Sequence, residues 1–524
     1  MAEGLANREL GRIARHANGD RGAETLLKHL AACATLAGGL SRQEMLDVTD
    51  RELHALRRSY PAGPGALVDL LHEALPLRGG GVAAVLPDIV GEALVLRAFT
   101  GPDTSDDGTA VVLRVVQTTT EKVVASVVRC CQDFCPAPAQ RREPLDWIAA
   151  LIREGKTQNP SLLVQIDAAM PAYSLSLAEL AVEVSRALLA AFTGEGIDEN
   201  DESKSAIRAR LLVTLATRLS DLGRREEALE RAEEAESIYQ QLAARQPDAL
   251  LPRHATSLDN LALMLSELGR REEALERATQ AERIRRQLAE SRPLAVLSDH
   301  ANSLNNLAIM LSALGRNDQA LEHAAAAERI RRQLATDRPA AFLPDHAKSL
   351  INLALRLSAL SRREEALGRA AEAERIYRQL AEARPDAFLP DHAMSLNCLA
   401  GTLSELGRHA EALGRAAEAE RIYRQLAAPR PDVFTVDWAR SLARVGACLR
   451  ASARNTEAAD QFKAAISALL ATFLSLPRAH ARLMDNMSRH YIACVQQAGG
   501  EPDLSLLAPI TEVLQRLDDV KPER

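Results

Sequence analysis

The chain has 524 residues, of which 47% are hydrophobic and only 3% aromatic, and its formal net charge is −7. This length exceeds one compact core, so we expect two or more folding units, and the hydrophobic content excludes a disordered chain. Abundant Ala, Leu, Glu and Arg with few aromatics favour helices, and the acidic balance gives no indication of a nucleic-acid or anionic-membrane binder.

The start of the chain and its cysteines indicate a cytoplasmic protein. Residues 1–12 are polar and mixed in charge, unlike a signal peptide, and the longest apolar run, Leu30–Leu40, is too short to span a bilayer. The seven cysteines follow no even-spaced framework, although Cys130, Cys131 and Cys135 share one predicted helix. No histidine lies near these three, so we interpret them as buried thiols and not as a metal or redox site.

Residues 1–105 are predicted to form a winged-helix-like region. Helices are expected over Leu26–Gly39, Arg42–Asp50 and Ala66–Leu75, followed by a glycine-rich turn and a strand-like run over Val82–Leu86. Three helices and a small hairpin are the pattern of a winged helix.

Residues 106–200 are predicted to form a helical bridge, with helices over Val111–Gln132, Leu145–Arg153 and Leu175–Phe192. Within it, Gly155-Lys156-Thr157 is the only resemblance to a phosphate-binding loop. It follows a helix instead of a strand, and Ala150 stands where the upstream glycine is required. We therefore expect no nucleotide site and no cofactor.

The second half of the chain repeats itself every 46 residues. The turn position is held in successive copies by Gly223, Gly269, Gly315, Ser361, Gly407 and Ala453. The same step relates Pro247, Pro293, Pro339, Pro385 and Pro431, and also His254, His300, His346 and His392. A fixed period indicates identical units that bury their apolar faces against one another, so we predict a solenoid over 201–470 and capping helices over 471–524.

Each copy is predicted to be a pair of helices. In the third copy, Asp299 is expected to cap a first helix whose apolar stripe is Leu304, Leu307, Ala308, Leu311 and Leu314. Gly315 ends that helix and a second runs over Asn317–Thr336. Pro339 is expected to stop the second helix, and a short loop then leads to the next cap at Asp345.

The string Ser303–Ala308, Ser-Leu-Asn-Asn-Leu-Ala, resembles the tetratricopeptide repeat in its kinesin-light-chain-like branch. The resemblance implies a right-handed superhelix of antiparallel helix pairs, whose first helices line an inner groove that binds a peptide or protein. The usual repeat has about 34 residues. We expect the extra dozen to extend the second helix and its loop.

A second resemblance concerns Leu86–Leu94, which is similar to the segment after the nucleotide-binding module in signal-transduction NTPases of the STAND class. It implies an alternative function, in which the chain is the sensor and docking half of such an NTPase. The ATPase module would then be absent or on another chain.

We interpret the recurring histidines, and the arginine pairs that recur at the same 46-residue step, as structural residues and not as binding sites. Packed helices lie about 8–10 Å apart, whereas zinc needs each imidazole nitrogen within about 2.1 Å, so histidines one copy apart cannot share a metal. We expect them to pack beside the caps, with no metal bound. Arg285–Arg286 and Arg331–Arg332 are interpreted as a solvated helix face.

The candidate site is a ladder of polar residues in the otherwise apolar first helices. Its members are Asp259, Asn260, Asn305, Asn306, Asn352 and Asn397. An amide both donates and accepts hydrogen bonds, and the resemblance implies that such residues contact the main chain of a bound peptide. The alternative is that they bridge neighbouring helices.

Together these patterns predict an all-α protein, a solenoid of helix pairs behind a smaller, mostly helical amino-terminal region. The predicted function is a non-catalytic scaffold that binds a protein or an extended peptide, with no nucleic acid, membrane or cofactor as partner. We predict no enzyme, and the sequence favours no particular oligomeric state.

Overall fold

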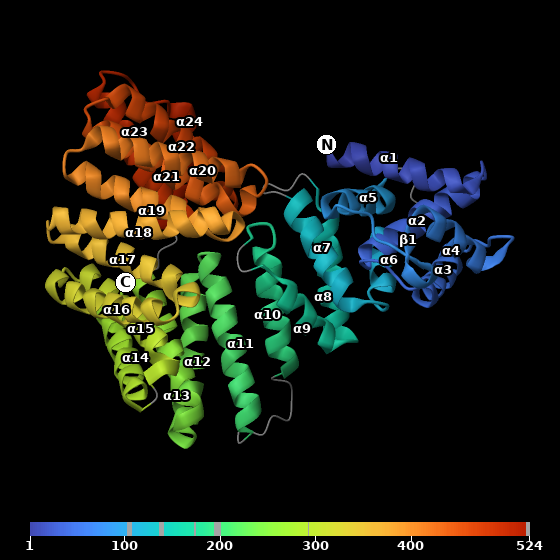
Figure 1. The fold of residues 1–524 in the computed structure, drawn as a ribbon, viewed down its shortest axis with the longest axis horizontal. Coiled ribbons are helices and arrows are strands. Elements are labelled where there is room, and N and C mark those ends of the chain that lie inside the picture. Colours follow the sequence, from blue (N-terminus) through green and yellow to red (C-terminus); the bar gives the residue numbers. More distant parts are fainter. Residues whose placement is uncertain (102–106, 136–140, 172–173, 193–200, 292, 520–524) are drawn as a thin grey trace. The chain divides into compact units, whose positions relative to one another are not determined.

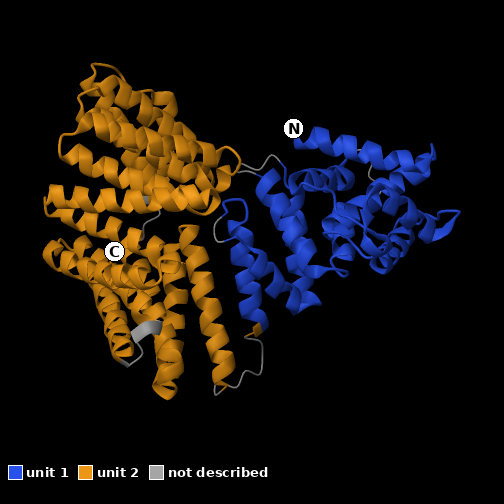
Figure 2. Ribbon diagram, in the orientation of Figure 1, with its two compact units in different colours: residues 1–191 blue, residues 192–524 orange. Residues whose placement is uncertain are grey.

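The computed structural model describes residues 1–101, 107–135, 141–171, 174–192, 201–291 and 293–519. They divide into two compact units, Met1–Ala191 and Phe192–Arg524 (Figure 2). The described residues form 24 α-helices and a single two-stranded sheet, so the predicted all-α class is confirmed. None of the described helices combines the length and the apolar character that a membrane span requires.

The first part of unit 1 is a group of helices with a short hairpin. In chain order the elements are α1 (Ala2–Ala14), η1 (Arg15–Ala17), α2 (Arg21–Leu36), α3 (Arg42–Ala55), α4 (Gly63–Ala74), β1 (Pro76–Leu77), η2 (Arg78–Gly80) and β2 (Gly81–Val82). The strands pair antiparallel, and Leu40 forms an isolated bridge to Val82. The strand expected over Val82–Leu86 is wrong beyond its first residue, because the chain leaves the sheet there and turns toward the next helix at Pro87.

Six further helices complete unit 1. They are α5 (Asp88–Thr100), α6 (Gly108–Val115), α7 (Thr120–Phe134), α8 (Glu143–Thr157), α9 (Pro160–Ala169) and α10 (Ala178–Phe192). The single helix expected over Val111–Gln132 is two helices, because the poor helix formers Thr118 and Thr119 lie between α6 and α7. The predicted boundaries after residues 105 and 200 lie outside the described residues.

Unit 2 is a stack of helix pairs that follow one another in chain order from α11 to α24 (Figure 1). The first helices of the copies are α11 (Glu202–Asp221), α13 (Pro247–Glu267), α15 (Pro293–Ala313), α17 (Pro339–Ala359), α19 (Pro385–Glu405), α21 (Pro431–Ala451) and α23 (Pro477–Gln497). The second helices are α12 (Arg225–Arg245), α14 (Arg271–Ser291), α16 (Asn317–Asp337), α18 (Arg363–Ala383), α20 (His409–Ala427), α22 (Asn455–Ser475) and α24 (Leu504–Asp519). The 46-residue register therefore continues beyond residue 470, where Pro477 holds the place of Pro431.

The proline of each copy starts a helix and does not stop one. Pro339 is the first residue of α17, where its missing N–H leaves no hydrogen bond unmade, and Arg338 alone separates it from α16. The predicted caps at Asp299 and Asp345 are therefore wrong, since both residues lie inside first helices. The residues beyond the usual repeat length extend both helices of the copy to 21 residues. The expectation that they extend only the second helix and its loop is therefore wrong.

The turn inside each copy has the predicted left-handed conformation. The backbone φ angle is 80° at Gly269, 74° at Gly315 and 74° at Gly407. Ser361 and Ala453 adopt the same conformation, with φ angles of 58° and 59°, although a side chain makes it costly. The turn geometry is thus kept even where glycine has been replaced.

Small side chains allow the two helices of a copy to approach closely. In α16 Ala320, Ala324 and Ala327 are all fully buried, and the predicted stripe of α15 is buried from Leu304 to Leu311. The sixth copy departs from this rule with Phe462 on its second helix, and Gly446 faces it from the first. A Cβ on Gly446 would lie 3.0 Å from the Phe462 ring, so the large residue is accommodated by the loss of a small one.

The first helices lie on the inner side of the stack. From α11 to α21, each one contacts the next first helix along the chain more extensively than successive second helices contact one another over the same copies. In a stack of helix pairs, the closer-spaced helices line the side toward which the array curves. The exposed side chains of the first helices therefore share one continuous surface.

Replacing Ser361 with glycine should raise the stability of unit 2, because a non-glycine residue in the left-handed conformation costs about 1 kcal/mol or more. We expect a higher thermal midpoint by circular dichroism. The matched control is Ser404→Gly, which places the same substitution inside α19 and should lower the midpoint. If Ser361→Gly lowers the midpoint as much as Ser404→Gly, the turn is not under the strain described.

Candidate functional site

The candidate site is an exposed stripe on three neighbouring first helices, α13, α15 and α17, which we name the first-helix face. It consists of three rows of residues with a 46-residue step: Thr256, Asn302 and Lys348; Asn260, Asn306 and Asn352; and Leu263, Ile309 and Leu355. Within one helix, the rows are four and three residues apart, so they lie on the same side of the helix.

The aliphatic row is the feature that sequence reasoning missed. Leu263, Ile309 and Leu355 are 39%, 37% and 46% exposed. A single exposed leucine is ordinary, but three at the same position of adjacent helices make a continuous apolar strip. Their common step of 46 residues was a signal for it in the sequence. The strip is confined to these copies, since Thr217 and Gly401 occupy the position in the copies on either side.

Two of the predicted site residues, Asp259 and Asn305, are buried and bond to the next copy. The Ser303 hydroxyl donates to Oδ2 of Asp259 over 2.7 Å, and the Asn305 amide donates to the Ser349 hydroxyl over 3.2 Å. Asn397 occupies the same position two copies later, and its buried carbonyl oxygen accepts no hydrogen bond from the described residues. This position therefore faces the neighbouring first helix.

The other three predicted residues, Asn260, Asn306 and Asn352, follow one position later and are half-buried on the first-helix face. A step of one residue rotates the side chain by about 100° around the helix, which separates Asn260 and Asn352 from the bridging position. Asn306 still forms a side-chain hydrogen bond with Asp259 of the preceding copy. The sequence placed all six in one ladder, whereas the structure brings them into two rows with different surroundings.

The arginine pairs are only partly solvated. Arg285 and Arg331 are 5% and 3% exposed, so the prediction of a solvated face is wrong for them. It holds for Arg286 and Arg332, each of which forms an ion pair with the glutamate four residues before it. Adjacent helix positions point in different directions, and only the second arginine of each pair can face solvent.

Arg285, on α14, forms hydrogen bonds with both α13 and α15. Its guanidinium donates to the main-chain oxygen of Asp299 over 2.8 Å, to the Ser303 hydroxyl over 3.0 Å and to the Thr256 hydroxyl over 2.9 Å. It also lies 3.0 Å from Oδ2 of Asp259. Burial raises the pKa of Asp259, and the charge of Arg285 acts against that rise. The pair is thus a compensated buried charge at the edge of the first-helix face.

Arg331 repeats this arrangement without the acid. It donates to the main-chain oxygen of Asp345 over 3.1 Å and to Ser349 over 2.9 Å, and it contacts the Asn302 side chain. Asn305 stands where Asp259 stands one copy earlier, and no described carboxylate forms an ion pair with Arg331. Burial accordingly lowers the pKa of Arg331.

Tyrosine replaces arginine at this position in the next two copies. The hydroxyl groups of Tyr377 and Tyr423 donate to the main-chain oxygens of Pro344 and Pro390, each over 2.9 Å. Pro344 and Pro390 lie on α17 and α19, the first helices of the tyrosines' own copies. The hydroxyl groups therefore bond within a copy, whereas the guanidinium groups of Arg285 and Arg331 bond to the first helix of the next copy.

The histidine ladder forms hydrogen bonds with a glutamate ladder that sequence reasoning did not connect to it. The Nε2–Oε1 distances are 2.9 Å for His254–Glu236, 3.1 Å for His300–Glu282, 3.0 Å for His346–Glu328 and 3.2 Å for His392–Glu374. In the next copy Trp438 donates to Glu420 over 2.8 Å. The histidines do not pack beside helix caps as expected, because each first helix begins seven residues earlier. They link each first helix to the preceding second helix.

Among the described residues of unit 1, one cluster has metal-ligating residue types, formed by His29, Cys33 and Glu52. Both carboxylate oxygens of Glu52 already accept from Arg114, over 2.7 and 2.8 Å, and one also bonds to His29 over 2.8 Å. Burial raises the pKa of Cys33, which keeps it a thiol. A guanidinium at the carboxylate opposes a cation there, so we read the cluster as a structural network between α2, α3 and α6.

The two remaining candidate sites from the sequence, the Gly155-Lys156-Thr157 segment and the three clustered cysteines, are part of the packed helices of unit 1. Gly155-Lys156-Thr157 forms the last turn of α8, where main-chain N–H groups bond within the helix, and Lys156 pairs with Glu183 over 2.7 Å. Cys130, Cys131 and Cys135 are buried and free.

The helix pairs correspond to a known repeat. The tetratricopeptide repeat family matches residues 254–293 and 300–337, and a second description of the same repeat matches residues 400–425. The chain carries tetratricopeptide repeats. The first two matched segments contain most of α13–α16, and so include two of the three helices of the first-helix face. No curated protein matches the sequence.

Several solved structures resemble the chain at low identity. A putative kinesin light chain with TPR-like repeats from Podospora anserina is 19% identical, covering 42% of this chain and 97% of that one, with a TM-score of 0.33. The Rap conjugation regulator of plasmid pLS20, solved with the Phr* peptide, is 13% identical over 76% of this chain and 98% of its own, with a TM-score of 0.43. A STAND protein with a tetratricopeptide repeat sensor from Pyrococcus horikoshii is 14% identical over 94% of this chain and 65% of its own, with a TM-score of 0.40. The repeat assignment itself rests on the family match and the 46-residue register.

The glutamate–histidine ladder should make stability depend on pH. Hydrogen bonds with His300 and His392 lower the pKa of Glu282 and Glu374 below the ordinary value of 4.5. A lowered folded-state pKa stabilises the fold above the unfolded value, and that stability is lost as the pH falls through the folded value. The double variant Glu282→Gln/Glu374→Gln should therefore melt earlier at pH 7 and lose less stability than the wild type below about pH 4.5.

The control for this experiment is Glu276→Gln/Glu322→Gln, which changes two exposed glutamates of the second helices. Thermal midpoints measured from pH 7 to pH 3 provide the comparison. Parallel curves for the ladder variant and the wild type would contradict the role of the ladder.

The two arginine sites allow a matched exchange between copies. Asp259→Asn should lower the free energy of unfolding by about 3 kcal/mol, because it leaves Arg285 buried without its carboxylate. Asn305→Asp supplies Arg331 with the acid that it lacks and should have the opposite sign. Urea denaturation of both variants measures the effects. A decrease of the midpoint in both would show that Arg331 does not need a counter-charge.

Proposed function

We propose that this protein is a non-catalytic scaffold that binds an extended peptide segment of a partner protein on its first-helix face. The observation that supports the proposal is the pairing of two rows. The amides Asn260, Asn306 and Asn352 are half-buried, and the aliphatic residues Leu263, Ile309 and Leu355 are exposed. One row is suited to a main chain and the other to apolar side chains.

The amide row matches the chemistry of an extended backbone. Such a backbone offers an N–H donor and a C=O acceptor at every residue, and an asparagine side chain can serve both. The structure gives Asn260 and Asn352 no hydrogen bond to other described side chains. Their polar groups are therefore free to bond to a partner, while Asp259 and Asn305 maintain the contacts between copies.

The spacing of the rows suits a chain that crosses the helices. Successive first helices are about 8–10 Å apart, and an extended peptide advances about 3.3 Å per residue. About every third peptide residue would then meet an aliphatic side chain of the face. A partner segment with apolar residues at this interval, separated by polar ones, is the ligand that the surface favours.

The alternative, a sensor half of a STAND-type NTPase, remains a prediction of the sequence. In that case the same face would recognise the signal, and the ATPase module would lie elsewhere. Binding of a peptide by the isolated full chain without nucleotide supports the scaffold function in either setting.

The test begins with selection of binders from a random peptide library on the immobilised full chain. We expect enriched peptides to lose affinity for Asn260→Ala/Asn352→Ala by about tenfold to a few hundredfold, since each lost hydrogen bond is worth about 1 kcal/mol and unpaired peptide groups add to the loss. The thermal midpoint should be unchanged or slightly higher, because alanine is the better helix former. Titration calorimetry gives the affinities.

The matched control is Gln333→Ala/Gln379→Ala, which removes two exposed amides from the second helices of the third and fourth copies. It should leave peptide affinity unchanged. Equal affinity of the peptides for the wild type and for Asn260→Ala/Asn352→Ala, or failure to enrich any peptide, would refute the proposed function.

A further inference from the structure

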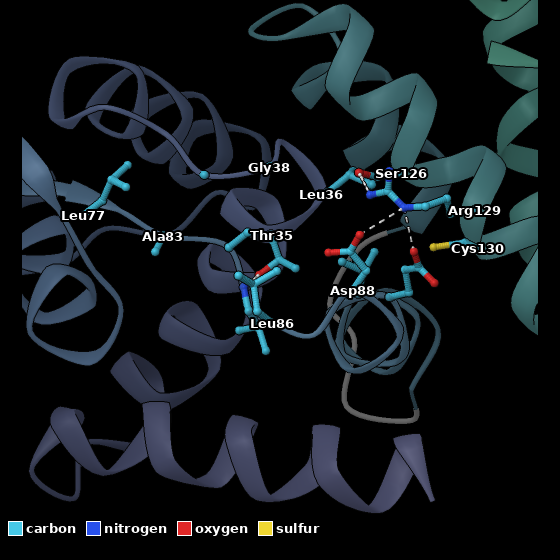
Figure 3. A pocket seen from close by; sticks show the side chains of 15 residues that line it. Thr35, Leu36, Gly38, Leu77, Ala83, Leu86, Asp88, Ser126, Arg129 and Cys130 are labelled. Atoms are coloured by element: carbon cyan, nitrogen blue, oxygen red, sulfur yellow. Dashed lines mark hydrogen bonds and ion pairs between the residues drawn. The ribbon is translucent and has the colours of Figure 1, made fainter. Parts of the chain in front are cut away.

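Unit 1 contains a cavity of about 320 Å³ between α2, α5, α7 and the segment that precedes α5. Its polar side chains bond to one another, and Figure 3 shows Arg129 between Asp88 and Ser126. Arg129 also donates to Glu92 over 2.9 Å, and Glu92 forms a further side-chain hydrogen bond with Asp133. The wall of this cavity therefore gives no chemical indication of a ligand. A departure from regularity that does carry an inference lies in unit 2.

The turn of the first copy in unit 2 is covered by a distant part of the chain. Gly269, Gly315 and Gly407 are exposed, and a Cβ on any of them would meet nothing within 4 Å. Gly223, at the same position, is buried, and its Cβ would lie 2.5 Å from the main-chain nitrogen of Ala479. Ala479 belongs to the first turn of α23, so the first copy of the stack meets the seventh.

The side chains next to this contact are more deeply covered than their equivalents in other copies. Leu222 is 5% exposed, whereas Leu268 and Leu314 at the same position are half-buried. His480 is 8% exposed, whereas Phe434 at the same position one copy earlier is half-buried. The meeting of the two ends thus covers a side chain on each of them.

The contact is small and has unsatisfied polar groups beside it. Neighbouring helices of unit 2 pack along their length, whereas the contact of the first copy with α23 is limited to a few residues. Nε of Arg225 and Nε2 of His480 are buried and form no hydrogen bond with the described residues. Buried polar groups without partners destabilise the state that buries them, and opening of the contact would let water reach them.

A side chain at Gly223 would force the contact apart. Its neighbours there are main-chain atoms, including the carbonyl carbon of Arg478 at 2.7 Å from the Cβ position, so no rotation of a side chain can make room. The φ angle of Gly223 is 72°, a conformation that asparagine tolerates better than most residues. Gly269 has a φ angle of 80° and no neighbour, so the same substitution there tests the turn conformation alone.

We propose that the contact between Gly223 and Ala479 is a latch that closes the stack around the first-helix face, and that a partner segment reaches this face when the latch opens. The first helices line the inner side of the stack, so a stack whose first copy meets its seventh encloses them. The fraction of molecules with an open latch then limits the apparent affinity for a partner. The inference rests on the proposed function for the identity of the partner, whereas the latch is a property of the stack itself.

The first test measures how reagents of different size reach the first-helix face, and it needs no partner. Ile309→Cys supplies a thiol on the face, and Gln333→Cys supplies one on the exposed side of α16 as the reference. Each variant is treated with N-ethylmaleimide and with a maleimide that carries a long polyethylene glycol chain, and mass spectrometry assigns the modified cysteine. Relative to position 333, we expect the large reagent to modify position 309 more slowly than the small one by about tenfold or more.

Two matched variants connect this difference to the latch. Gly223→Asn, combined with Ile309→Cys, should remove most of the difference between the reagents, and Gly269→Asn in the same background should keep it. Circular dichroism checks the folding of both. A difference that persists in folded Gly223→Asn would overturn the latch. If Gly223→Asn does not fold, equal relative rates of the two reagents at position 309 with Gly223 intact would overturn it.

The second test measures the association rate of a library-selected peptide by stopped-flow fluorescence. Gly223→Asn should raise this rate by about tenfold, and Gly269→Asn should leave it unchanged. Peptide that associates with the wild type and both variants at one rate would overturn the latch and leave the proposed function intact. If no peptide is selected while Gly223→Asn removes the size dependence at position 309, the latch stands and the proposed function is refuted.

Discussion

The close approach of the helices within each copy is the constraint on which unit 2 depends. The near side of each second helix from α12 to α22 carries fully buried alanines, such as Ala320, Ala324 and Ala327 in α16. Neither helix of a copy can cover its apolar stripe alone, so stability is shared between neighbours along the stack. Where the rule is broken, at Phe462, the facing Gly446 restores the fit. Packing of these small side chains therefore sets the distance between the two helices of a copy.

The polar contacts then fix how one copy sits on the next. Glutamate–histidine pairs join first helices to the preceding second helix, and Arg285 reaches the main chain of the next first helix. Tyr377, at the position of Arg285 two copies later, instead bonds to the first helix of its own copy. These groups are buried and partnered, which leaves the first-helix face free of structural duties at Asn260 and Asn352. A rigid stack can thus present two ordered rows of side chains to a partner, which lowers the entropy lost on binding.

The sequence was sufficient for the helix pairs, because a 46-residue period, turn glycines and apolar stripes are local signals. The sequence misplaced the helix starts, because a proline is compatible both with the end of one helix and with the first position of the next. In the structure Arg338 alone separates α16 from Pro339, the first residue of α17. The sequence could not assign Arg285 to the interior, because that requires knowing that Asp259 and Ser303 meet it from two other helices. The cavity at Glu92 lay beyond it for the same reason, as its walls come from segments far apart in the chain.

The most direct test of the first-helix face is photocrosslinking at single positions with a library-selected peptide. A photoreactive amino acid placed at Ile309, on the first-helix face, is compared with the same group at Gln333, on the exposed side of α16. Mass spectrometry of the products identifies the linked positions. The account predicts a crosslink to the peptide from position 309 and none from position 333. A crosslink from position 333 without one from position 309 would show that the partner binds the second helices.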